Sequence, residues 1–245
     1  MSLVNTPGEQ PVHFPKTEAF QFDDEVAAIF ENMAERSIPM YREAHRIHTA
    51  ILEPALRQPC AVLDVGASTG AFFTAICNRL QLGVGEKPNH IFAMALDNSK
   101  PMCDRLSANF PWVKVICADV LKAPPLPLQP NIINMMYVLQ FIRPEMKARA
   151  IEWVYDALPE NGILLLGQKD NIGSGIGSAF QTEYIRFRMG NGYTKEEIDA
   201  KTLALRNSMW CSDPRDLREM LRGVGFSLVE ETTRWLNFST LICVK

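Results

Sequence analysis

The sequence predicts a doubly wound α/β fold: a mostly parallel sheet of seven strands, a helical lead-in before the first strand, and an antiparallel hairpin at the C-terminal end. Three observations support this prediction. Short apolar runs alternate with amphipathic segments over residues 61–167, as in a parallel sheet covered by helices. The last two β-rich runs, 225–233 and 235–245, leave no room for a helix between them. Finally, 245 residues that are 47% hydrophobic are enough for one large core.

Two helices are expected before the first strand. The apolar residues within 26–33 recur at helical spacing, and Asp23 and Asp24 precede them, where negative charge suits a helix N-terminus. Pro39 interrupts this pattern, and a second helix is expected over residues 40–56.

From residue 61 onward, strands and helices alternate. The expected strands are 61–65, 91–97, 113–119, a fourth starting at 132, and 163–167. The expected helices between them are 70–80, 101–110 and 145–158. After the fifth strand the alternation stops, because residues 178–206 have a helical pattern and a further helix, 214–221, precedes the hairpin.

We expect a single domain over residues 21–245, with a helical insertion at about 173–212. Residues 1–20 hold three prolines and no periodic pattern, so we expect a flexible N-terminal arm there. The arm has neither the basic start nor the apolar centre of a signal peptide.

The composition limits the classes of function. A formal charge of −3, with 22% charged residues, does not favour direct binding to nucleic acid. No apolar run reaches the roughly 18 residues that a membrane span requires, so no membrane association is expected. The six cysteines are scattered without any CxxC pair, which predicts reduced thiols in the cytoplasm and no metal site.

The stretch VLDVGASTG, residues 62–70, follows the pattern of a strand, a tight turn and a helix N-terminus that offers backbone N–H groups to a ligand. A dinucleotide loop has a further glycine where this sequence has Ser68. The carboxylate of Asp64 disfavours a phosphate but suits a cation. S-Adenosylmethionine carries a sulfonium and an ammonium group, so the turn favours this ligand, with contacts expected at Asp64, Gly66, Ser68 and Gly70.

Two further acids end neighbouring strands. Asp97 ends the second expected strand, where a carboxylate accepts hydrogen bonds from ribose hydroxyls, and Asp119 ends the third, where it can meet an adenine amino group. Parallel strands end at one crevice, so these acids and Asp64 are expected to converge there. The alternative is a dehydrogenase. Its ribose-binding acid comes about 20 residues after the glycines, and Asp97 comes later than that.

From about residue 22 to residue 245 the sequence resembles the carboxy-S-adenosylmethionine synthases of bacterial tRNA wobble-uridine modification, which have the Rossmann-like class I methyltransferase fold. The resemblance is carried by FDDEVAAIFENMAERSIPMY (22–41), LDVGASTG (63–70), LDNSKPM (96–102), ADV (118–120), LQFIRP (139–144), RMGNGYTKEEI (188–198) and LNFSTLICVK (236–245). The family also carries serine at the position of Ser68. The resemblance implies a homodimer and cofactor contacts at Tyr41, Gly66, Asp97, Asn98, Asp119 and Val120.

The sequence departs from the family pattern at two positions. Thr202 stands where the family has an arginine that grips the added carboxylate, and Met136 aligns with an asparagine of the cofactor site. Since neither side chain replaces a charged, bidentate arginine, we expect a methyltransferase that uses S-adenosylmethionine and a small-molecule acceptor. The alternative is a carboxy-S-adenosylmethionine synthase that uses prephenate. A second alternative is a non-catalytic protein that binds S-adenosylmethionine, S-adenosylhomocysteine or the carboxylated cofactor.

The catalytic residue is left open between three candidates. His45, which with His48 shares a helical face with Tyr41, is a candidate general base if the acceptor must lose a proton. Tyr137 follows the fourth strand and is a candidate for contact with the acceptor. Arg206 lies one helical turn after Thr202 and is a candidate for binding a carboxylate from there.

Overall fold

The computed structural model describes residues 22–83, 85–173 and 175–245, so the arm predicted over residues 1–20 lies outside the described residues. The strands are β1 Cys60–Val65, β2 Ile91–Asp97, β3 Lys114–Cys117, β4 Ile132–Met136, β5 Ile163–Lys169, β6 Leu228–Trp235 and β7 Phe238–Val244. The α-helices are α1 Asp24–Ser37, α2 Tyr41–Ile51, α3 Glu53–Leu56, α4 Ala71–Arg79, α5 Lys100–Asn109, α6 Pro144–Ala157, α7 Ile176–Gly190, α8 Lys195–Leu205 and α9 Pro214–Val224, with 3-10 turns η1 Val120–Lys122 and η2 Leu139–Phe141.

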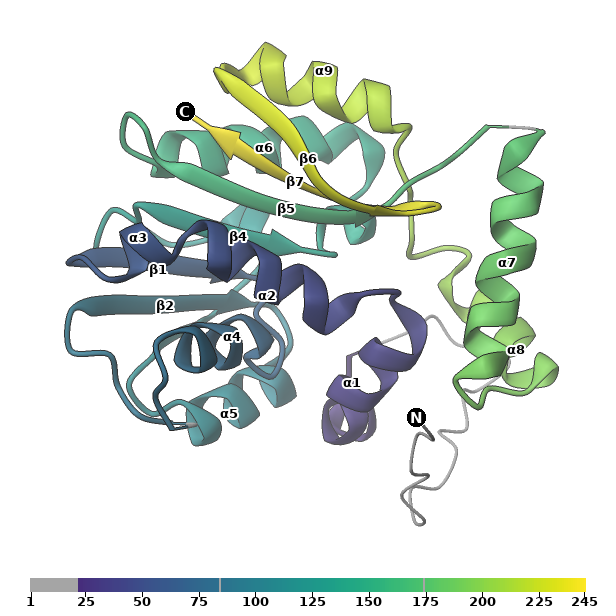
Figure 1. Cartoon of the computed structure of the whole chain (residues 1–245), viewed down its shortest axis with the longest axis horizontal. Coiled ribbons are helices and arrows are strands. Elements are labelled where there is room, and N and C mark those ends of the chain that lie inside the picture. Colours follow the sequence, from purple (N-terminus) through teal and green to yellow (C-terminus); the bar gives the residue numbers. More distant parts are fainter. Residues whose placement is uncertain (1–21, 84, 174) are drawn as a thin grey trace.

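All seven strands form one sheet in the order β3-β2-β1-β4-β5-β7-β6 (Figure 1). Strands β1 to β5 pair in parallel, while β7 is antiparallel to both β5 and β6. This confirms the predicted mostly parallel sheet with its C-terminal hairpin.

Two of the boundaries that differ from the prediction have a clear physical cause. The helix expected over 40–56 is divided into α2 and α3, and Pro54, which has no amide hydrogen to donate, lies in the first turn of α3. The fifth strand extends past Gly167 to Lys169, because Gln168 and Lys169 pair with Ser239 and Phe238 of β7. The second difference brings Lys169 to the C-terminal edge of the sheet.

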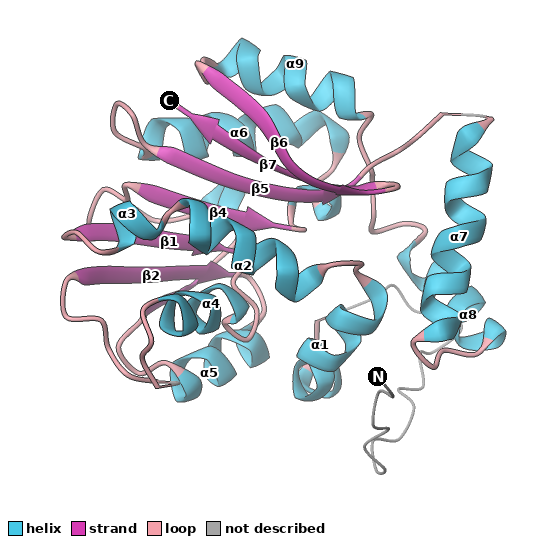
Figure 2. Ribbon diagram, viewed as in Figure 1, coloured by secondary structure: helices cyan, strands magenta, loops and turns pink. Residues whose placement is uncertain are grey.

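Helices cover both faces of the sheet (Figure 2). Successive residues of β1 point to opposite faces, so Val62 packs with α3, α4 and α5, while Leu63 packs with α6 and α9. Both side chains are fully buried. The sheet is therefore the middle layer of three.

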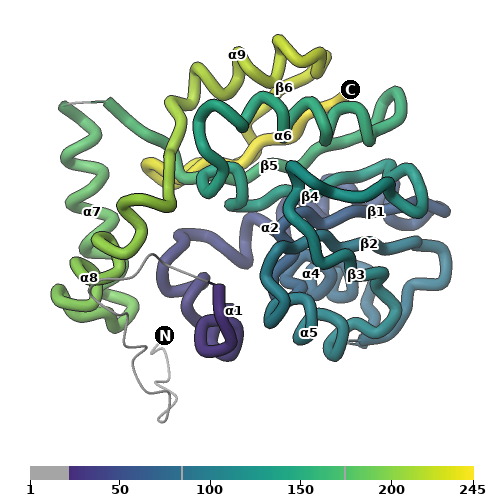
Figure 3. The backbone as a smooth tube through the Cα atoms, turned by 180° about the vertical axis from the view of Figure 1, so that it is seen from behind, coloured from purple at the N-terminus to yellow at the C-terminus, as the bar shows by residue number. Residues whose placement is uncertain are grey.

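Helices α7 and α8 lie beyond the C-terminal ends of the parallel strands, opposite α1 (Figures 1 and 3). The Tyr184 hydroxyl donates to the carbonyl of Ser37 at 2.9 Å, and Arg36 Nε donates to the carbonyl of Asn191 at 2.7 Å. These bonds connect the helical segment after β5 to the C-terminal end of α1. Helix α1 and the segment α7–α8 together enclose the space beyond the strand ends. In the described ranges, no helix has both the length and the apolar character needed to cross a bilayer.

Candidate functional site

A cavity of about 450 Å³ lies at the C-terminal ends of the parallel strands, between α1, α2 and the segment α7–α8. This edge is where open α/β sheets bind ligands, and the volume is in the range of small-molecule sites. The predicted contact residues that line it are Tyr41, Asp64, Gly66, Ser68, Asp97, Asn98, Asp119, Val120 and Met136. Nine of the residues that line the cavity were therefore predicted from the sequence as cofactor contacts.

The turn after β1 has a backbone that favours glycine. Gly66 has φ +67, and a Cβ added to it would lie 2.2 Å from Val138 Cγ2. Ser68 also has a positive φ, +49, and its amide donates to Asp97 Oδ2 at 2.8 Å. The carboxylate of Asp97, at the end of the neighbouring strand, therefore holds the turn in place through the amide of Ser68. The turn lines the cavity although it lacks the additional glycine of a dinucleotide loop.

Gly70 does not line the cavity, in contrast to our expectation of a cofactor contact. It is the N-cap of α4 with φ +100, and an added Cβ would lie 2.5 Å from Phe110 Cε2. The glycine is needed for close packing of the turn against the core.

Asp97 is fixed by two backbone amides. Besides the bond from Ser68, the amide of Ser99 donates to Asp97 Oδ1 at 2.9 Å. Burial raises the pKa of Asp97, while these amide bonds oppose that shift. The carboxylate is therefore held in one orientation at the end of β2, as a hydrogen-bond acceptor for a diol requires.

Asp64 lies deeper in the cavity and pairs with a residue that the sequence analysis missed. Asn134 Nδ2 donates to Asp64 Oδ1 at 2.7 Å, across neighbouring strands β1 and β4. Burial raises the pKa of Asp64 to about 8, with a smaller contribution from the charge of Asp97. A cation bound beside Asp64 would lower this pKa again, so the site fits a sulfonium or ammonium group.

Asp119 lies at the exposed rim of the cavity, at the end of β3. Its side chain also caps the turn η1 by accepting a bond from the amide of Leu121 at 2.8 Å. With Asp64 and Asp97, all three predicted acids line the same cavity, as expected.

Two of the three catalytic candidates line the cavity. Tyr137 has φ +62 and its ring centroid is 6.1 Å from that of Tyr41; burial raises the pKa of both phenols. His45 also lines the cavity, and neither of its ring nitrogens has a hydrogen-bond partner among the described residues. Burial lowers the pKa of His45 to about 3 and that of His48 to about 4, so both are weak bases.

The third candidate lies elsewhere. Arg206 is exposed at the C-cap of α8 and is not a lining residue. Thr202 is also exposed, and its hydroxyl donates to the carbonyl of Ile198. The residues of α8 that line the cavity are Lys201 and Leu205, and Lys201 donates to Ser37 Oγ at 3.0 Å.

Lys169 is a further cationic lining residue that the sequence analysis missed, as is the exposed Arg143. It lines the cavity from the end of β5, and its Nζ lies 4.4 Å from the ring centroid of Tyr184. The rule that identified Asp97 and Asp119 at strand ends applies equally to Lys169, but the predicted strand stopped at Gly167. The pairing of β5 with β7, which extends the strand, has no local signal.

The chain is similar in sequence to curated proteins over nearly its whole length, although no family model matches it. It is 34% identical over 235 residues to the carboxy-S-adenosyl-L-methionine synthase of Helicobacter hepaticus (strain ATCC 51449 / 3B1), over 92% of this chain and 95% of that protein. It is 31% identical over 238 residues to the protein of the same name from Nautilia profundicola (strain ATCC BAA-1463 / DSM 18972 / AmH), over 94% of this chain and 97% of the relative.

Solved structures give the same fold. The plantazolicin methyltransferase BpumL, in complex with a monoazolic desmethylPZN analog and SAH, superposes with a TM-score of 0.64 at 12% identity, over 90% of each chain. A TehB-like SAM-dependent methyltransferase from Corynebacterium glutamicum superposes with a TM-score of 0.56 at 15% identity, over 91% of this chain and 97% of that one. The predicted class I methyltransferase fold is therefore confirmed.

Proposed function

The chain belongs to the carboxy-S-adenosyl-L-methionine synthase family, and from that premise we propose that it is an enzyme that binds S-adenosyl-L-methionine and converts it to the carboxylated cofactor. The sequence analysis favoured methyl transfer to a small acceptor and kept this synthesis as the alternative. The curated relatives support the alternative better.

The observation that carries this proposal is the order of three acids and one lysine along the strand ends that line the cavity. Asp119, Asp97 and Asp64 follow one another at the ends of β3, β2 and β1, and Lys169 lines the cavity at the end of β5. The acids suit the ribose and the sulfonium of the cofactor. A carboxylate next to the sulfonium, which distinguishes the product from S-adenosyl-L-methionine, requires positive charge on the far side, where Lys169 and Lys201 lie.

The chemistry balances without an oxidant if prephenate is the carboxyl donor, as the family resemblance implies. The methyl carbon loses a proton and forms a bond to the carboxyl carbon of prephenate. Loss of that carboxyl group and of the ring hydroxide leaves aromatic phenylpyruvate, and the proton and the hydroxide combine to water. The cavity residues bind and orient the two reactants.

The test is to incubate the purified protein with S-adenosyl-L-methionine and prephenate, and to analyse the cofactor by mass spectrometry. We expect carboxy-S-adenosyl-L-methionine and phenylpyruvate, formed together and only when both substrates are present. Mass spectrometry of the ligand that copurifies with the protein provides an independent readout. Plain cofactor alone in both experiments would contradict the proposal.

A second candidate function is methyl transfer to a small acceptor, and Met136 favours it. Its side chain is buried and lines the cavity beside Tyr137, where the family resemblance implies a polar asparagine. An apolar wall suits an acceptor without a transferable carboxylate. S-Adenosylhomocysteine formed with a surrogate acceptor, without carboxylated cofactor, would identify this function, and the absence of any adenosyl ligand would identify a non-catalytic protein.

The resemblance implies a homodimer and the scattered cysteines favour a location in the cytoplasm, and both remain predictions. Sedimentation equilibrium measures the first, and fractionation of cells that express the protein at native level measures the second.

A further inference from the structure

Three cations gather around the aromatic rings at the α7–α8 end of the cavity. Lys169 Nζ lies 4.4 Å from the ring centroid of Tyr184 and 5.7 Å from that of Phe238. The Arg188 guanidinium lies 4.3 Å from the ring centroid of the same tyrosine. Lys201 Nζ lies 5.6 Å from the ring centroid of Tyr193 and bonds to Ser37. Aromatic faces attract cations, but they carry no net negative charge that would neutralise Lys169 or Arg188.

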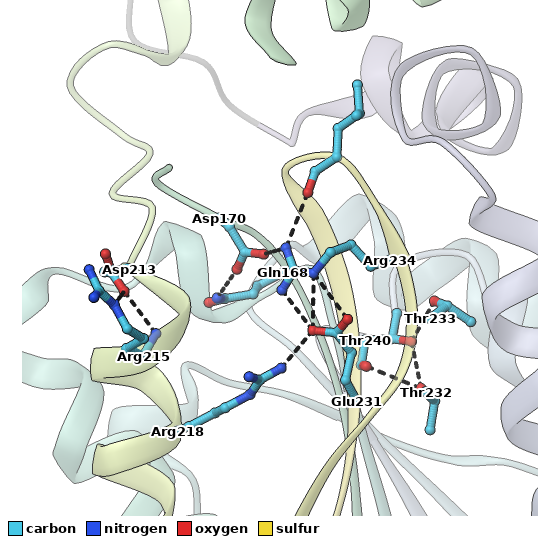
Figure 4. A network of polar contacts seen from close by, with 11 residues as sticks. Gln168, Asp170, Asp213, Arg215, Arg218, Glu231, Thr232, Thr233, Arg234 and Thr240 are labelled. Atoms are coloured by element: carbon cyan, nitrogen blue, oxygen red, sulfur yellow. Dashed lines mark hydrogen bonds and ion pairs between the residues drawn. The ribbon is translucent and has the colours of Figure 1, made fainter. Parts of the chain in front are cut away.

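No carboxylate in the part of the chain that the structure describes forms an ion pair with Lys169 or Arg188. Asp170, the neighbour of Lys169 in sequence, turns away: it accepts a bond from Arg234 at 2.8 Å and another from Gln168 (Figure 4). Arg188 is only 4% exposed, and its Nε has no hydrogen-bond partner among the described residues. Buried charge without a counterion is unfavourable, and a bound anion would relieve it.

The titration of the two lysines agrees with this geometry. Burial, with a smaller contribution from the charge of Arg188, lowers the pKa of Lys169 to about 8 and that of Lys201 to about 7. Lys169 also lowers the pKa of Lys201, so the two ammonium groups affect each other. A bound carboxylate would favour the charged form of both.

We propose that Lys169 and Lys201 bind the carboxylate that is transferred, first on the donor and then on the sulfonium carbon, in place of the arginine that Thr202 replaces. This inference rests on the proposed function, and it assigns the binding site of the transferred carboxylate to two residues of this chain. The position of the lysines supports it, since both line the cavity while Thr202 and Arg206 are exposed. Arg188, which contacts the ring of Tyr184, adds positive charge near the lysines without lining the cavity.

The test is the affinity of the variant Lys169→Met for two ligands, measured by titration calorimetry. We expect its dissociation constant for carboxy-S-adenosyl-L-methionine to rise about 10- to 100-fold, since a hydrogen bond between charged groups is lost. The constant for S-adenosyl-L-methionine should change less than about threefold. The variant Lys169→Arg, which keeps the charge, should retain the preference for the carboxylated ligand.

The matched control is Lys147→Met. Lys147 is 3% exposed, bonds to the carbonyl of Trp210 and to Ser212 Oγ at 2.7 Å, and does not line the cavity. Its replacement should lower the melting temperature and leave the ratio of the two affinities unchanged. A general loss of packing therefore cannot mimic the expected result.

An equal loss of both affinities in Lys169→Met would overturn the inference, because Lys169 would then bind the amino-acid carboxylate that both ligands share. Unchanged affinities would overturn it as well. The proposed function fails separately: a wild-type protein that binds the carboxylated ligand through Lys169 but forms none of it from prephenate would contradict the synthesis and leave the site intact.

Discussion

The acidic and the cationic ends of the cavity are built in different ways. Asp97 is held by the amide of Ser99 at its own strand end and by the amide of Ser68 in the turn after the neighbouring strand β1, so backbone groups fix its carboxylate. Lys169 and Lys201 come from β5 and α8, and their long side chains are positioned by the ring of Tyr184 in α7 and by the hydroxyl of Ser37 in α1. The acidic end is held by hydrogen bonds between neighbouring strand ends of the sheet, whereas the cationic end depends on how the helices α1, α7 and α8 pack beyond it.

The largest effect is expected from removing the fixed acid. Asp97→Ala should weaken binding of S-adenosyl-L-methionine at least about 100-fold, because two hydrogen bonds to a charged group are lost, each worth about 1.5–3 kcal/mol. Titration calorimetry measures the dissociation constant of S-adenosyl-L-methionine for the variant and the wild type. The control is Asp104→Ala, whose exposed side chain pairs only with Lys100 among the described residues. A loss below about tenfold would show that Asp97 serves the turn and not the ligand.

A smaller but still large effect is expected in the turn itself. Gly66→Ala adds a Cβ at 2.2 Å from Val138 Cγ2 in a backbone with φ +67, so we expect a destabilisation of about 2–4 kcal/mol and weaker cofactor binding. Chemical denaturation measures the free energy of unfolding. Gly223→Ala, in α9 with no atom within 4 Å of the added Cβ, should instead stabilise the protein by about 0.5–1 kcal/mol. Equal effects of the two variants would contradict this explanation.

The buried acid in the middle of the cavity should give a pH-dependent effect. Burial raises the pKa of Asp64 to about 8 in the folded protein, against about 3.9 in the unfolded chain. The contribution of Asp64 to stability is therefore full below about pH 4 and is lost as the pH rises to about 8.

The variant Asp64→Asn removes this loss. Without ligand it should be more stable than the wild type by about 1–3 kcal/mol at pH 8, and the difference should shrink toward pH 5. Its affinity for S-adenosyl-L-methionine should fall about tenfold, because the sulfonium loses a negative partner. Thermal unfolding at the two pH values and calorimetry measure these effects, and a difference in stability that does not depend on pH would be the contrary result.

The smallest effect is expected from Arg206→Ala. Its side chain is exposed and outside the cavity, so binding of cofactor and prephenate should change less than about twofold. A tenfold loss in prephenate binding, measured as the Michaelis constant, would instead place the carboxylate site at Arg206, as the sequence alone had suggested.

The acidic end was predictable because its rule is local. Asp97 and Asp119 end apolar runs that are visible in the sequence, and the ends of parallel strands always share one edge of the sheet. The seven strands, the hairpin and the strand–turn–helix at residues 62–70 follow from the same short-range patterns.

The cationic end was decided by tertiary structure. Lys169 reaches the cavity because β5 pairs with β7, about 70 residues later in the chain, and this pairing extends the strand by two residues. On α8, neighbouring residues point about 100° apart, so the docking of the helix against Ser37 determines that Lys201 faces the cavity and that Thr202 and Arg206 do not. A sequence fixes which side chains share a face of a helix, but only packing selects the face that is buried.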